Sequence, residues 1–130
     1  MAIDYKEMLE KAKEVSKNAY ARYSNFNVGA CILASSGKYY VGCNMENASY
    51  GMALCAERNA ISTAIANGER QIDVVAIYSP NMDDCTPCGA CRQVIWEFSN
   101  RENPCVVITE VNGEPKEYTI DKLLPAGFDL

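Results

Sequence analysis

Hydrophobic residues in this chain recur first at a helical spacing and then at a strand-like one. The helical spacing near the start links Met8, Ala12, Val15 and Ala19. With Lys and Glu on the opposite side, it predicts an amphipathic helix over about 4–23 whose role is packing. Two strand-like runs, 27–34 and 38–45, follow and are joined by a short Ser-Ser-Gly turn, so a β-hairpin is expected next.

The second half of the chain repeats this alternation. A stripe of apolar residues predicts a helix over about 54–67, which Gly68 ends, and a third helix is expected over about 88–98. A continuous apolar run over 72–78, typical of a strand covered on both faces, lies between them. A further strand is expected over 105–111.

The chain after these elements is predicted to turn tightly at Asn112-Gly113 and to form a short helix, capped by Thr119 and finished before Pro125. No repeat, low-complexity tract or Pro/Gly/Ser-rich linker interrupts the pattern, so residues 1–130 are interpreted as a single domain. The order of helices and strands predicts a three-layer α/β fold around a mixed sheet.

Two cysteine clusters carry the candidate chemistry. Cys55-Ala56-Glu57 lies at the start of the second predicted helix, and Pro87-Cys88-Gly89-Ala90-Cys91 at the start of the third. One ligand with a Glu two residues on, followed by Pro-Cys-x-x-Cys, is the signature of zinc nucleobase deaminases. Three thiolates fill three corners of a tetrahedral zinc ion and leave the fourth for a reactive water. A catalytic zinc is therefore the leading hypothesis.

The amino-acid composition limits which side chain can act as the base and which substrates the protein can bind. The chain contains no histidine, so a base that works near neutral pH must be a carboxylate with a shifted pKa, and Glu57 is the candidate. The net charge is −5 and the Lys and Arg residues are scattered, which removes the counterion release that holds a polyanion. We therefore expect a small neutral substrate and no nucleic-acid partner.

The number of cysteines and the hydropathy of the chain bear on the cellular compartment of the protein. Seven cysteines are an odd number, no signal-peptide pattern opens the sequence, and no apolar run approaches the ~18 residues that span a bilayer. We therefore expect a soluble, cytoplasmic protein without membrane contact. Cys31, Cys43 and Cys105 lie in strand-like runs and are interpreted as core thiols.

Two arginines adjoin the cysteine clusters. Arg58 and Arg92 each follow a ligand-bearing turn and are predicted to donate hydrogen bonds to the thiolates, which withdraws negative charge from the metal. The alternative is that both are surface helix charges. The free N–H groups at helix N-termini also favour thiolates.

Simpler interpretations of the cysteines stay open. Cys88 and Cys91 alone could be a thioredoxin-like redox pair or half of a structural zinc site. A redox pair gives no role to Cys55 or Glu57. A closed structural site needs a fourth ligand, for which Cys85 is a nearby candidate.

Further segments resemble the cytidine deaminases of the small homotetrameric type. They are, in order, 23–30, 42–48, 55–58, 87–93 and 123–125, within about 20–128. The resemblance implies an α/β/α sandwich with a mixed, mostly five-stranded sheet. It also implies hydrolytic deamination of cytidine and 2′-deoxycytidine to uridine and 2′-deoxyuridine plus ammonia, in pyrimidine salvage.

The resemblance implies that one zinc ion per chain is bound by Cys55, Cys88 and Cys91. Glu57 would take a proton from the zinc water and pass it to N3 of cytosine, so that zinc hydroxide attacks C4. A second proton, delivered to the amino group, would release ammonia.

Five residues are implied to contact the nucleoside. The Ala56 N–H would meet the base carbonyl, the Thr86 carbonyl would meet the exocyclic amine, and Phe26 would lie against the substrate. Asn44 and Glu46 would hold the ribose 3′-hydroxyl, one able to donate and the other to accept. An ordinary polar strand end is the simpler interpretation of this pair.

Two aromatic residues are implied at a boundary between subunits. Phe128 matches an aromatic that reaches a neighbouring subunit's active site in similar enzymes, and Tyr50 is expected near the same interface. The alternative is a Phe128 ring packed on its own core.

Two other functions are weighed against this one. A blasticidin-type or other small aminopyrimidine deaminase would share the metal site without the sugar-holding pair. A structural zinc or C-x-x-C module is the non-enzyme hypothesis.

Overall fold

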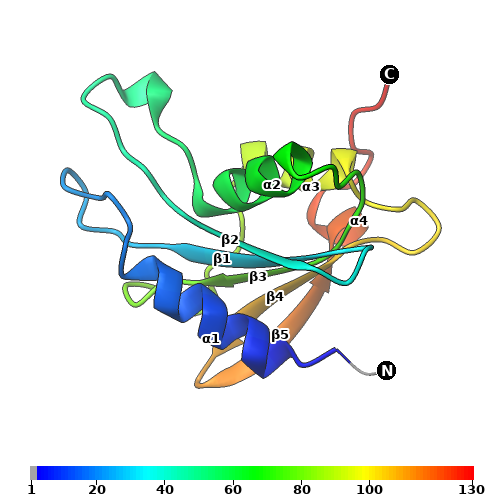
Figure 1. Ribbon diagram of the computed structural model, residues 1–130, viewed down its shortest axis with the longest axis horizontal. Coiled ribbons are helices and arrows are strands. Elements are labelled where there is room, and N and C mark those ends of the chain that lie inside the picture. The colour runs from blue at the N-terminus through cyan, green and yellow to red at the C-terminus, as the bar shows by residue number, and fades with distance from the viewer. Residues whose placement is uncertain (1–2) are drawn as a thin grey trace.

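The computed structural model describes residues 3–130 and places helices on both faces of a single sheet (Figure 1). The strands are β1 (Gly29–Ala34), β2 (Tyr39–Cys43), β3 (Ile72–Tyr78), β4 (Val106–Val111) and β5 (Glu114–Thr119). Within the described residues this five-stranded sheet has the order β2-β1-β3-β4-β5. The β3–β4 pair is parallel and the others are antiparallel, so the predicted mixed sheet is confirmed.

The helices form the outer two layers. Helix α1 (Tyr5–Ser16) contacts β1, β2 and β3 on one face, and α2 (Ala56–Ala66) covers β1 and β2 on the other beside α3 (Gly89–Glu97). A 3₁₀ turn, η1 (Tyr50–Met52), precedes α2, and the short α4 (Ile120–Leu123) follows β5. The arrangement is the expected α/β/α sandwich.

Helix α1 is shorter than the sequence pattern predicts, since it ends at Ser16 and not near residue 23. Beyond it, the Tyr20 N–H donates to the Asn44 carbonyl over 3.0 Å, and the Tyr20 carbonyl accepts from the Glu46 N–H over 2.8 Å. A longer helix would use those same backbone groups for its own hydrogen bonds. The chain therefore leaves the helix in order to run beside the end of β2.

Two glycines let helices lie directly on the sheet. A Cβ atom at Gly29 would stand 1.9 Å from the Ala12 carbonyl oxygen of α1, and one at Gly42 would stand 2.4 Å from the Ala60 nitrogen of α2. Side chains at either position would force the layers apart. Gly42 thus helps set the height of α2, and with it the position of the Cys55 end of that helix.

Each face of the sheet has its own hydrophobic core. The α1 side buries Met8, Leu9, Ala12, Cys31, Val74, Ala76 and Ile108. The core on the α2 and α3 side is larger and includes Cys105. Cys31 and Cys105 are buried, as expected for core thiols, whereas Cys43 is half-buried.

The last hairpin differs in part from the expectation. Asn112 and Gly113 form the predicted tight turn, with φ of 51° and 81°. The strand that follows, β5, pairs with β4 at the sheet edge. Thr119 occupies the N-cap of α4, but its side chain makes no capping hydrogen bond, so that part of the prediction is wrong.

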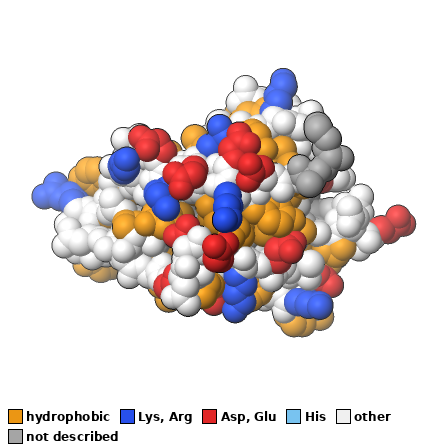
Figure 2. All heavy atoms as spheres, turned by 90° about the horizontal axis from the view of Figure 1, so that it is seen from below, with side chains coloured by type: hydrophobic (Ala, Val, Ile, Leu, Met, Phe, Trp, Pro, Cys, Tyr) orange, Lys and Arg blue, Asp and Glu red, His pale blue; other side chains and the backbone are white. Residues whose placement is uncertain are grey.

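The face of the molecule drawn in Figure 2 has no patch of a single charge sign among its described residues. There, Lys and Arg side chains are interspersed with Asp and Glu (Figure 2). Within residues 3–130, no helix has the length and apolar character that crossing a membrane requires.

Candidate metal centre and cleft

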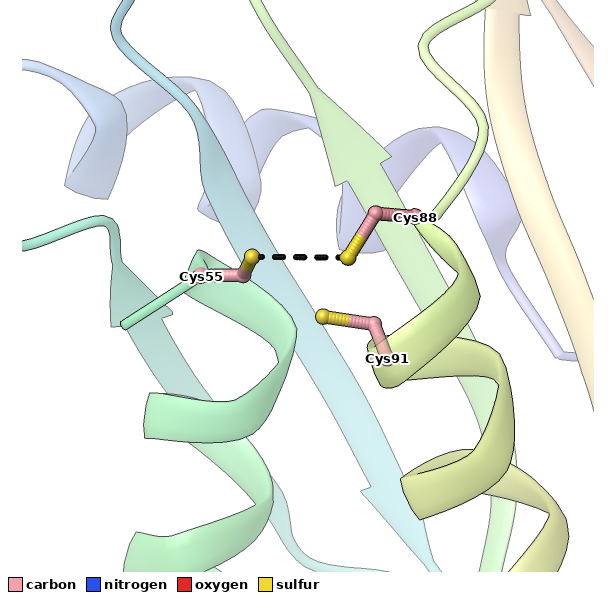
Figure 3. A group of neighbouring side chains, drawn as sticks. All are labelled: Cys55, Cys88 and Cys91. Atoms are coloured by element: carbon pink, nitrogen blue, oxygen red, sulfur yellow. Dashed lines mark hydrogen bonds between the residues drawn. The ribbon is translucent and has the colours of Figure 1, made fainter. Parts of the chain in front are cut away.

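Helices α2 and α3 both begin at a cysteine. Cys55 is the N-cap of α2 and Cys88 the N-cap of α3, and neither side chain makes a capping hydrogen bond. Cys91, in the first turn of α3, is fully buried. The sulfurs of these residues point toward one another across the gap between the helix starts (Figure 3).

The spacing of the sulfurs fits a metal ion. The three Sγ atoms lie within 4.8 Å of one another, and Cys55 and Cys88 are separated by 3.6 Å. A disulfide would need a separation of about 2.05 Å. Zinc–sulfur bonds of about 2.3 Å in a tetrahedron place sulfurs about 3.8 Å apart.

The set is also open. Among the described residues, no fourth His, Cys, Asp or Glu joins the group, and Cys85 stays outside it. A closed structural zinc site therefore lacks the fourth protein ligand that it needs. The three thiols fit a zinc ion with one coordination position free.

The environment favours a thiolate in the cluster. A hydrogen bond from the Cys91 thiol lowers the pKa of Cys55 to about 5, with help from Arg58, whose Nη2 lies 3.5 Å from the Cys55 sulfur. The pKa of Cys91 is raised, because it donates to Cys55 and is buried. The lowered pKa of Cys55 favours the thiolate form that a zinc ligand requires.

Arg92 does not contact a thiolate, so that prediction is wrong. Its Nε donates to the Pro87 carbonyl over 2.8 Å, and its Nη1 donates to the Leu123 carbonyl over 2.8 Å. Carbonyl oxygens of the preceding loop and of α4 lie within reach of the guanidinium. Arg92 consequently ties the Pro-Cys-x-x-Cys loop to the end of α4.

Glu57 lies in the first turn of α2 and is only 4% exposed. Burial raises the pKa of its carboxyl to about 7, and the neighbouring Cys55 acts in the same direction. A carboxyl in this state can both accept and release a proton near neutral pH.

A cleft of about 520 Å³ opens over the cysteines. Its walls include Tyr50 and the five residues that the family resemblance implies to contact the nucleoside, namely Phe26, Asn44, Glu46, Ala56 and Thr86. Glu57, Arg58, Cys55 and Cys88 also line it. Residues from four separate stretches of the chain thus meet the metal site in one cavity.

The cleft also contains residues that the sequence analysis did not place there. They are Val28, Gly51, Ala53, Leu54 and Cys85. Cys85 is buried, and burial raises the pKa of its thiol to about 11. Its position three residues before Cys88 is the signal that could have placed it at the wall.

Asn44 and Glu46 are engaged by the protein itself. The Asn44 amide accepts from the Val28 N–H over 2.9 Å and donates to the Phe26 carbonyl over 2.8 Å. Glu46 accepts from the Ser24 hydroxyl and from the backbone N–H groups of Tyr23 and Ser24, which lowers its pKa. Each side chain still has unused hydrogen-bonding capacity.

The two aromatic residues assigned to an interface are strongly exposed. Tyr50 is 83% exposed at the rim of the cleft, and Phe128 is 65% exposed. Phe128 does not line the cleft of its own chain. The alternative in which its ring packs on its own core is therefore wrong.

Known proteins resemble this chain along most of its length. The family model for the cytidine and deoxycytidylate deaminase zinc-binding region matches residues 3–109. The chain belongs to this deaminase family. A cytidine deaminase of Sporosarcina psychrophila is 42% identical over 126 residues, covering 97% of this chain and 92% of that protein.

Other members of the deaminase family extend the comparison. The crystal structure of cytidine deaminase from Burkholderia pseudomallei matches with a TM-score of 0.88 and 38% identity, over 97% of this chain and 100% of that one. A blasticidin-S deaminase of Bacillus cereus is 31% identical, covering 94% of this chain and 90% of that protein.

Proposed function

We propose that this chain catalyses the hydrolytic deamination of cytidine and 2′-deoxycytidine, with one zinc ion held by Cys55, Cys88 and Cys91. The observation that supports it is the open group of three thiols beside a buried carboxylate, at a cleft of about 520 Å³ that is lined by Cys55, Cys88 and Glu57. Bound zinc supplies Lewis acidity, which lowers the pKa of a water molecule at its open position.

Glu57 is the proton carrier in this proposal. Its buried carboxyl would take the two protons of the attacking water in turn, giving the first to N3 of cytosine and the second to the amino group. The overall reaction forms a bond from C4 to the oxygen of water, breaks the bond from C4 to the amino nitrogen, and releases ammonia. Burial keeps bulk water from competing for these protons.

Backbone groups at the cleft would orient the base. The Ala56 N–H is in the first turn of α2, where helix N–H groups have no partner within the helix, and is suited to the base carbonyl. The Thr86 carbonyl would accept from the exocyclic amine, and Phe26 would lie against the ring. Asn44 and Glu46 would hold the 3′-hydroxyl while keeping their bonds to the chain.

We place this activity in a homotetramer with active sites shared between subunits. The exposed Tyr50 at the cleft rim and the exposed Phe128 near the end of the chain support contacts with neighbouring subunits, because large exposed apolar side chains favour a covering partner. Light scattering gives the assembly mass. When Phe128→Ala chains are mixed with Glu57→Gln chains, the activity of the mixture should differ from the sum of the activities of the two variants, which independent monomers would give.

We assign the protein, as a single domain over residues 1–130, to pyrimidine salvage in the cytoplasm. The continuous sheet, the reduced cysteines and the family support this assignment. The relative that acts on blasticidin S makes a blasticidin-type deaminase the second candidate.

One experiment separates these functions. Zinc per purified chain is measured, and ammonia release is assayed with cytidine, 2′-deoxycytidine, cytosine and blasticidin S. We expect one zinc per chain and release from the two nucleosides. Release from blasticidin S alone would favour the second candidate, and zinc without release from any of them would favour a structural module.

A further inference from the structure

After α4, the chain passes beside the C-terminal end of α3, the end opposite the one that starts at Cys88 (Figure 1). Ala126 adopts a left-handed backbone conformation, with φ of 56°, at the turn. Gly127 then lies against the Trp96 indole so closely that an added Cβ would stand 2.7 Å from its Nε1 atom. The terminal segment is thus fitted to the tryptophan.

Arg101 holds both partners of this contact. Its guanidinium stacks on Trp96, 3.9 Å from the ring centroid, and donates to the Trp96 carbonyl over 2.5 Å. Its Nη2 donates to the Asp129 carboxylate over 2.6 Å. Gln93, which lies one turn before Trp96 on α3, donates a hydrogen bond to the Phe128 carbonyl over 3.1 Å. Backbone and side chain of the segment are therefore fixed at three successive residues, 127–129.

The Trp96 ring is held by packing and not by a hydrogen bond. Its Nε1 atom is buried and has no hydrogen-bond partner among the described residues. The ring packs against the hydrophobic core on the α2 and α3 side, the Arg101 plane and the Gly127 backbone. Against this fixed backbone, the Phe128 side chain stays 65% exposed and so is presented away from its own domain.

We propose that Arg101 and Trp96 are positioning residues that clamp residues 127–129 and so aim the Phe128 ring at the cleft of a neighbouring chain. This inference rests on the proposed shared active site and deepens it. A ring on a loose segment would occupy the binding position only part of the time. Apparent nucleoside affinity falls in proportion to that occupied fraction.

Two variants release the segment from opposite sides. Arg101→Gln removes the stacked charge and the bond to Asp129, and Gly127→Ala forces the segment off the indole by steric overlap. Trp96 is the only tryptophan in the sequence, so its emission and its quenching by acrylamide report on the cover of the indole. We expect both variants to show red-shifted emission and stronger quenching, with zinc content unchanged.

Kinetics distinguish positioning from mere stability. We expect KM for cytidine to rise about fivefold to tenfold in both variants while kcat stays nearly constant, because only binding of the free substrate is weakened. Adding Phe128→Ala to either variant should raise KM no further than Phe128→Ala alone. Arg101→Lys should raise KM less than Arg101→Gln does, since lysine keeps the positive charge for Asp129 but not the planar stack on Trp96.

Lys6→Gln is the matched control. It removes one positive charge and breaks an exposed ion pair, here with Glu114 at 3.4 Å, without touching α3. Its quenching and KM should equal those of the original chain.

Several results would overturn the proposal. Unchanged quenching in both variants would mean that no clamp exists. Stronger quenching with normal KM, while Phe128→Ala raises KM, would mean that the clamp does not aim the ring. Normal KM in Phe128→Ala, with zinc-dependent deamination intact, would remove the shared site but leave the proposed reaction standing. Absence of deamination in the original chain would instead refute the reaction, and the positioning role with it.

Discussion

The helices on the two faces of the sheet begin in different ways. On one face, α1 starts at Asp4, whose carboxylate accepts from the Glu7 N–H over 3.1 Å. On the other, α2 and α3 start at Cys55 and Cys88, whose side chains make no capping bond. A good N-cap stabilises a helix by about 1 kcal/mol, so two helices forgo that contribution where a metal site is formed.

The difference shows that α2 and α3 lack the stabilising side-chain cap of α1 and carry metal-binding thiols at that position instead. The thiols do not cap the first N–H groups of α2 and α3, and the partial positive charge of both helix N-termini lies beside the sulfurs. Packing holds these helix starts in place, since Gly42 lets α2 lie on the sheet and Arg92 anchors the loop before α3. Because these packing contacts hold the N-terminal ends of α2 and α3, their cysteines are available to bind a metal ion.

The largest expected effect comes from removing a sulfur at a helix start. Cys88→Ala should lose bound zinc and deamination together, because two thiols cannot hold the ion in an open site. Metal analysis and ammonia release measure both. Cys43→Ala is the control, since it removes a half-buried thiol outside the group and should keep zinc. Full zinc content and turnover in Cys88→Ala would remove Cys88 from the ligand set.

Glu57 tests the same helix start without touching a sulfur. Glu57→Gln should keep zinc and fold but lower kcat by about 10²–10⁴-fold, since the amide has similar size and cannot carry a proton. Zinc analysis and steady-state kinetics check the two parts. If activity stays within about tenfold, a change of only ~1.4 kcal/mol in the barrier, another group is the base.

The sugar side of the cleft gives a smaller effect. If Asn44 and Glu46 hold the 3′-hydroxyl, kcat/KM for 3′-deoxycytidine should fall about 10–200-fold relative to cytidine, because these half-buried polar side chains then lose a partner. Using a substrate analogue spares the bonds that Asn44 makes to Val28 and Phe26. The 2′-deoxy nucleoside serves as control. Equal efficiency with free cytosine would show that the base alone is recognised.

The sequence was enough to predict the parts of the site that depend on short spacing. Cys88 and Cys91 lie three residues apart, so a helix must turn both sulfurs the same way. The apolar runs of β3 and β4 likewise identify buried strands without further information. Spacing of this kind fixes geometry before any tertiary contact forms.

Other features depend on contacts between distant residues and could not be predicted. The end of α1 is set by pairing of Tyr20 with the chain near Met45. Strand β5 is a largely polar edge strand with no apolar alternation to reveal it. Arg92 binds carbonyls because the fold brings Leu123 to it, a choice that no local pattern specifies.

The smallest effect is expected on the α1 face, where the cap has only a local role. Asp4→Ala should lower the free energy of unfolding by about 1 kcal/mol, or Tm by about 4 °C, because the Glu7 N–H loses its acceptor. Asp4→Asn keeps an acceptor at that position and should restore most of the loss. Zinc content, KM and kcat should be unchanged in both, since α1 lies across the sheet from the cysteines. Thermal unfolding of the zinc-loaded protein measures the stability change. A loss of zinc or of turnover in Asp4→Ala would show that the two faces are coupled, and that the start of α1 is not merely structural.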